Sequence, residues 1–150
     1  MGYILSEEGS ELVSTVREFC ENEVKEQCKS FDESGEFPAD IVRQGAEMGL
    51  SALEVPEEYG GVGIDAITCA AICEEMAYAD AGFYTTMSAS GLALRPVLIA
   101  GNEEQKKWAC DVLIASRKAP TPGRTTLSAS AIFSGLSVIS ASNPRNSKAF

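Results

Sequence analysis

Two cysteines have a spacing that could support metal chemistry. Cys69 and Cys73 lie four residues apart, so both thiols face the same side of a predicted helix. A metal site would need two further ligands, and the chain has no histidine and no Cys-x-x-Cys pair to supply them. We therefore predict that both cysteines are small core residues and that the chain has no metal site.

The paired glutamates are poor candidates for acid–base catalysis. Glu74 and Glu75 occupy adjacent positions of a predicted helix, about 100° apart, so their carboxylates cannot share one substrate atom. Glu57 and Glu58 precede a glycine-rich loop, where solvated or ion-paired carboxylates are expected. The lack of histidine also removes the usual general base and nucleophile partner. We assign no catalytic residue in this chain.

A glycine-rich loop follows these glutamates. Gly60, Gly61 and Gly63 lack the spacing of a phosphate-binding loop, and the neighbouring carboxylates would repel a phosphate. We predict that the three glycines adopt positive φ and reverse the chain between two helices.

Composition excludes several classes of protein. The 150 residues are 45% hydrophobic, which is enough for one ordinary core. The net charge of −10 repels nucleic acid and anionic lipid, so neither a nucleic-acid nor a membrane partner is expected. Five cysteines form an odd set and no leader precedes Ser6, so we predict a cytoplasmic protein with free thiols.

Apolar periodicity predicts an all-α bundle of about five helices. The first is one long amphipathic helix that Ser6 caps and that extends to about Phe31. A short second helix opens after Phe37-Pro38 and stops at Gly49. The third begins at Asp65 and reaches about Tyr78.

Two further helices complete the predicted bundle. Residues 83–99 are apolar nearly all round, so we expect a central buried helix that Pro96 strains or kinks. Asp80-Ala81-Gly82 should end the third helix before this fourth helix begins. Asn102 and Gln105 have the spacing of a capping box that opens the fifth helix. Its predicted inward face consists of Trp108, Ala109, Val112 and Leu113.

Charge divides the chain into two regions. Residues 1–116 contain 7 basic and 22 acidic residues, a net charge of −15, whereas residues 117–150 carry only basic residues and a charge of +5. We predict a helical domain over 1–116 and an irregular, Ser-rich basic tail over 117–150. Short strands at 131–133 and 136–139 and a disordered tail both remain open as interpretations.

Four segments in order resemble the N-terminal helical domain of acyl-CoA dehydrogenases over about residues 5 to 116. They are Phe37-Pro38, Val55–Asp65 (VPEEYGGVGID), Glu74–Ala77 (EEMA) and Gly101–Lys107 (GNEEQKK). The resemblance implies a flavoprotein that oxidises an acyl-CoA to the trans-2-enoyl-CoA. In that family a glutamate removes the α-proton and FAD accepts the β-hydride. It also implies a homotetramer and an electron-transfer flavoprotein as electron acceptor.

The chain departs from the family after the fifth helix. Family members continue with a Leu-Thr-Glu-Pro-containing segment that holds the flavin, whereas residues 119–124 read APTPGR. The later helical domain that carries the base does not fit in the remaining residues. We therefore expect no cofactor-binding residue, no activity of the chain alone, and a truncation or frameshift after about residue 116.

Family position nevertheless indicates one candidate site. The helix that matches residues 83–99 lines the far end of the acyl pocket, which points to Tyr84, Thr85, Ser88 and Leu92. The alternative is that these side chains only pack the bundle. For the whole chain, the alternative function is a non-catalytic helical interaction module or a gene remnant without function.

Overall fold

The computed structural model describes residues 4–118 and contains only helices over that range. The first helix is continuous but not uniform. It consists of α1 (Glu7–Phe19), a π-helical turn η1 (Cys20–Val24) and α2 (Lys25–Ser34). Ser6 Oγ accepts a hydrogen bond from Gly9 N at 3.0 Å, which confirms the predicted cap. If this continuous helix is counted once, residues 4–118 contain five α-helices, as predicted.

The second helix and the glycine-rich loop follow the predicted order. Helix α3 covers Ala39–Glu47, and the short 3-10 turns η2 (Leu50–Ala52) and η3 (Glu57–Tyr59) lie on either side of Val55. Gly60 and Gly63 have positive φ, as predicted, whereas Gly61 does not. A Cβ on Gly61 would lie 1.7 Å from the Val55 carbonyl oxygen, so close backbone contact is what requires glycine there.

Tyr59 ties this loop to the last helix. Its hydroxyl donates a hydrogen bond to Glu103 Oε2 at 2.7 Å, and this bond raises the pKa of Tyr59 to about 12. Glu57 and Glu58 are exposed, which agrees with the predicted solvated carboxylates. The loop therefore has a structural role within the described residues.

A single residue separates the next two helices, α4 (Ala66–Ala79) and α5 (Ala81–Ala100). Asp65 caps α4 as predicted, because its Oδ1 accepts from the backbone N–H groups of Ile67 and Thr68. Asp80 ends α4 in an extended conformation and caps α5 by accepting from Phe83 N at 2.6 Å. The predicted break of three residues is therefore too long. Asp80 alone connects the two helices, because its side chain caps α5 directly.

The apolar sequence of α5 predicted a helix that is buried on all sides. In the structure only one side of α5 is buried. The core side of the helix is formed by Phe83, Met87, Ala93, Leu94 and Val97. Leu92 and Ile99 on its other side are 76% and 84% exposed. Pro96 lies within the helix on this exposed side. The prediction of full burial is wrong because residues 4–118 cover only one side of α5.

Helix α6 (Glu103–Lys118) begins with the predicted capping box. Asn102 N donates to Gln105 Oε1 and Gln105 N donates to Asn102 Oδ1, both at 2.9 Å. Trp108 is 36% exposed and not part of the inward face, whereas Cys110 is fully buried in its place. The helix runs past the predicted boundary at residue 116, and the tail segments 131–133 and 136–139 lie outside the described residues.

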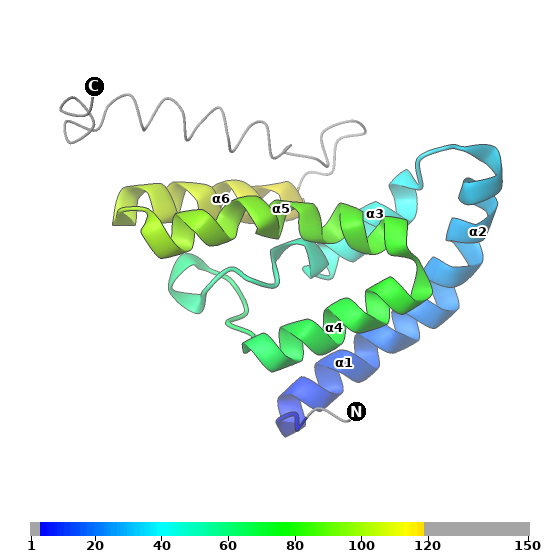
Figure 1. Cartoon of the computed structure of the whole chain (residues 1–150), viewed down its shortest axis with the longest axis horizontal. Coiled ribbons are helices and arrows are strands. Elements are labelled where there is room, and N and C mark those ends of the chain that lie inside the picture. The colour runs from blue at the N-terminus through cyan, green and yellow to red at the C-terminus, as the bar shows by residue number, and fades with distance from the viewer. Residues whose placement is uncertain (1–3, 119–150) are drawn as a thin grey trace.

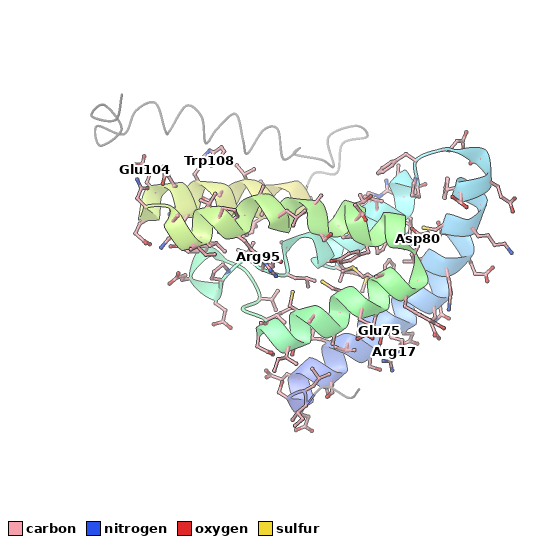
Figure 2. All side chains as sticks on the ribbon, viewed as in Figure 1. Arg17, Glu75, Asp80, Arg95, Glu104 and Trp108 are labelled. Atoms are coloured by element: carbon pink, nitrogen blue, oxygen red, sulfur yellow. The ribbon has the colours of Figure 1, made fainter. Side chains whose placement is uncertain are left out.

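The helices form two cores that meet at α5. Figure 1 shows α4 lying beside α1, and α6 lying beside α5. The larger core joins α1, α2, α3 and α4 to Phe83 and Met87, and the smaller one joins Leu94 and Val97 to α6. Glu75 on α4 forms an ion pair with Arg17 on α1, across the contact between these two helices (Figure 2). No helix of residues 4–118 is both long and apolar enough to cross a bilayer.

Replacing Asp80 with alanine should destabilise the bundle. The change removes the acceptor for Phe83 N and the turn that orients α5 against α4, so we expect the free energy of unfolding to fall by about 1–2 kcal/mol. Urea denaturation followed by circular dichroism measures this change. Asp111→Ala, on the exposed side of α6, is the matched control. Equal stabilities of the two variants would contradict the role of Asp80.

Candidate functional site

One face of α5 carries the four residues that were predicted to line an acyl pocket. At 3.6 residues per helical turn, Tyr84, Thr85, Ser88 and Leu92 lie within about 100° of one another around the helix axis. Arg95 and Ile99 continue the same face toward the helix C-terminus. These six positions form what we call the α5 face.

The four predicted residues differ in their surroundings. Tyr84 is half-buried against the larger core, whereas Leu92 is largely exposed. The exposed Thr85 hydroxyl donates to the Ala81 carbonyl at 2.8 Å. Ser88 is half-buried, and its hydroxyl lies 3.5 Å from the Thr85 carbonyl. The structure therefore places Thr85 and Leu92 on the surface, and leaves Tyr84 and Ser88 partly withdrawn.

An ion pair beside this face was not predicted. Arg95 Nε donates to Glu54 Oε2 at 2.6 Å, and this hydrogen bond raises the pKa of the Arg95 guanidinium. Figure 2 shows Arg95 on the side of α5 that faces the loop after α3. Arg95 is the only charged residue in α5. Its isolated position in an apolar helix was the sequence signal that could have indicated an ion pair.

The ion pair borders an open, mainly apolar groove of about 350 Å³. The groove is lined by Leu53, Glu54, Ile64, Ala66, Cys69, Arg95, Leu98 and Ile99. Its one cation is already paired, so the groove offers apolar contact more than charge recognition.

A small cavity lies behind the α5 face, between α4 and α5. Its volume is about 20 Å³, and Ser51, Cys69, Cys73 and Ser88 contribute to its wall. The Ser51 Oγ is shielded from solvent and has no protein hydrogen-bond partner. Cys69 and Cys73 do face the same side, as predicted. The hydrogen bond between their thiols lowers the pKa of Cys69 and raises that of Cys73.

Neither the glycine-rich loop nor Arg95 fits the diphosphate of FAD. A diphosphate needs converging N–H groups or free cations. The glycine-rich loop follows Glu57 and Glu58, which would repel it, and Arg95 is paired with Glu54.

Comparisons with known proteins point to a single family. Residues 6–115 match the family described as "Acyl-CoA dehydrogenase, N-terminal domain". A "Probable medium-chain specific acyl-CoA dehydrogenase 2, mitochondrial" from Caenorhabditis briggsae is 36% identical over 128 residues, which cover 82% of this chain and 31% of the relative. A "Probable acyl-CoA dehydrogenase fadE25" from Mycobacterium leprae is 32% identical over 111 residues, covering 74% of this chain and 28% of the relative.

A solved structure agrees with these relatives. The crystal structure of an acyl-CoA dehydrogenase complexed with FAD from Bacillus anthracis superposes with a TM-score of 0.58 and 34% sequence identity. The match covers 74% of this chain and 19% of that protein. The chain thus spans less than a third of the length of the relatives that it matches.

Replacing Ser51 with alanine should stabilise the protein. The substitution removes a buried hydroxyl that lacks a protein partner, and we expect a gain of about 1 kcal/mol in the free energy of unfolding. Thr68→Val is the contrasting variant, because the buried Thr68 hydroxyl donates to Asp65 Oδ2 and its loss should destabilise. Urea denaturation measures both. A loss of stability in Ser51→Ala would show that its hydroxyl is satisfied.

Proposed function

The chain belongs to the acyl-CoA dehydrogenase family, and on that premise we propose that its helical body supplies one wall of an acyl-CoA pocket. The observation that carries this proposal is the α5 face, where Leu92 and Ile99 stay exposed and where Arg95 and Ile99 line an apolar groove. An alkyl chain lying along this face would remove both side chains from water, which contributes about 25 cal/mol per Å² of apolar area buried.

The hydroxyl groups on this face support an apolar ligand. Thr85 donates to a carbonyl of its own helix, and the nearest acceptor of Ser88 is also a carbonyl of α5. Hydroxyls engaged in this way are not directed at a polar substituent, which leaves Tyr84 as the one other hydroxyl of the face. Tyr84, half-buried at the start of the face, would then close the far end of the pocket.

The complete reaction requires more than this chain provides. Oxidation of an acyl-CoA at its α and β carbons needs a carboxylate base and FAD, and we assign neither to residues 4–118. We propose that the chain is inactive alone and that an acyl-CoA is the substrate of the whole enzyme. An electron-transfer flavoprotein as acceptor, a homotetramer and a cytoplasmic location are further parts of the proposal.

A non-catalytic interaction module is the second candidate function. A groove of about 550 Å³ between α2 and the start of α5 favours it, because Phe37 on its wall is 55% exposed. Charged side chains of both signs, including Lys25, Lys29 and Asp32, also line this groove. Such a mixed surface suits a protein partner.

A chimeric enzyme distinguishes the two candidates. Residues 6–115 would replace the matching segment of the Bacillus anthracis acyl-CoA dehydrogenase, and the rate of acyl-CoA oxidation would be measured for several chain lengths. We expect the chimera to be active. Leu92→Trp should lower kcat/KM for long acyl chains at least tenfold more than for short ones, a difference of about 1.4 kcal/mol, because the indole fills the pocket.

Lys107→Trp on the exposed side of α6 is the matched control and should leave the chain-length profile unchanged. Identical profiles for the two tryptophan variants would refute the acyl-wall role of Leu92. A chimera that folds and retains FAD but oxidises no acyl-CoA would favour the interaction module.

A further inference from the structure

Four sulfur-containing side chains are among the thirteen residues that line the small cavity between α4 and α5. Cys69, Cys73 and Met76 lie at i, i+4 and i+7 on one side of α4, and Met87 reaches the same cavity from α5. Met76 and Met87 are almost fully buried, and Cys69 is 7% exposed. Figure 2 shows sulfur atoms, in yellow, in the space between these two helices.

We propose that this cavity binds one soft monovalent metal ion, Cu(I), through the thiolates of Cys69 and Cys73, with the thioethers of Met76 and Met87 beside it. Thiolate and thioether sulfur are the protein ligands that select Cu(I). The chain has no histidine that could compete for the ion. This inference does not depend on the proposed enzymatic function.

The ligand set distinguishes Cu(I) from zinc. A structural zinc ion takes four ligands from cysteine, histidine and carboxylates, in a tetrahedral arrangement. Within residues 4–118, no three side chains of these types gather so as to hold a metal. Beside the two cysteines, the other sulfur atoms at this cavity are the thioethers of Met76 and Met87. Thioethers suit a soft monovalent ion.

Both cysteines must lose a proton before they bind the ion. The Cys73 thiol donates a hydrogen bond to Cys69, which places the two sulfur atoms together on one side of α4. Each cysteine binds as a thiolate, so Cu(I) takes the place of the thiol protons of both Cys69 and Cys73, and these protons leave to solvent. No oxidation of sulfur or metal is involved.

The cavity also has the size and the route that a metal ion needs. Its volume of about 20 Å³ exceeds the roughly 10–15 Å³ that a water molecule requires, and Cu(I) is smaller than water. Cys69 lines both this cavity and the open groove beside Arg95. An ion can therefore reach Cys69 from solvent before it enters the cavity.

This inference revises the role expected from the sequence. Cys69 and Cys73 were predicted to be core residues because two further ligands were missing. Met76 continues their helical face and was visible as a third sulfur, but Met87 joins them only because α5 folds back against α4.

The test is a Cu(I) titration of the full chain under anaerobic, reducing conditions, in competition with a chromogenic Cu(I) chelator. We expect one Cu(I) per chain and no comparable binding of Zn(II). Cys69→Ala and Cys73→Ala should each lower the Cu(I) affinity at least tenfold. Met76→Leu and Met87→Leu, which conserve side-chain volume, should have smaller effects.

Two controls keep the outcome decisive. Cys110→Ala removes a buried thiol from the other core and should leave Cu(I) binding unchanged, as should Met48→Leu at an exposed site. X-ray absorption of the wild-type Cu(I) complex requires no variant and should show only sulfur ligands. Equal loss of affinity in Cys110→Ala, full affinity in the Cys69→Ala/Cys73→Ala double variant, or oxygen-dominated ligation would each overturn the proposal.

Discussion

Burial of one side of α5 is the contact on which the rest of the structure depends. Phe83 and Met87 enter the core formed by α1 to α4, and Leu94 and Val97 enter the core shared with α6. Full burial of each such side chain contributes about 1.5–3 kcal/mol. Because one helix serves both cores, its orientation fixes α4 and α6 relative to each other. Asp80 sets that orientation with a single-residue turn.

The opposite side of α5 follows from the same constraint. A helix that is apolar nearly all round and buried on one side presents its remaining apolar residues outward, here Leu92 and Ile99. These two side chains lie two helical turns apart on the same face of α5. The Glu54–Arg95 ion pair at the edge of this face satisfies its one charge. The described residues therefore leave an apolar side of α5 exposed.

Local signals in the sequence predicted most of the helix boundaries. The caps formed by Ser6, Asp65 and the Asn102–Gln105 pair were predictable because each bond joins residues only two or three positions apart. Features that depend on tertiary packing were not predictable in this way. The Glu54–Arg95 pair joins residues 41 positions apart, and the exposed side of α5 depends on which surfaces the other helices cover.

The central claim is that this chain contributes an acyl-contacting wall but does not hold the flavin. The most direct measurement is the visible absorbance of the purified chain after incubation with FAD and gel filtration, followed by addition of an acyl-CoA. The account predicts a colourless protein fraction and no change in absorbance with the acyl-CoA. A yellow protein whose flavin absorbance bleaches on addition of the acyl-CoA would contradict the account.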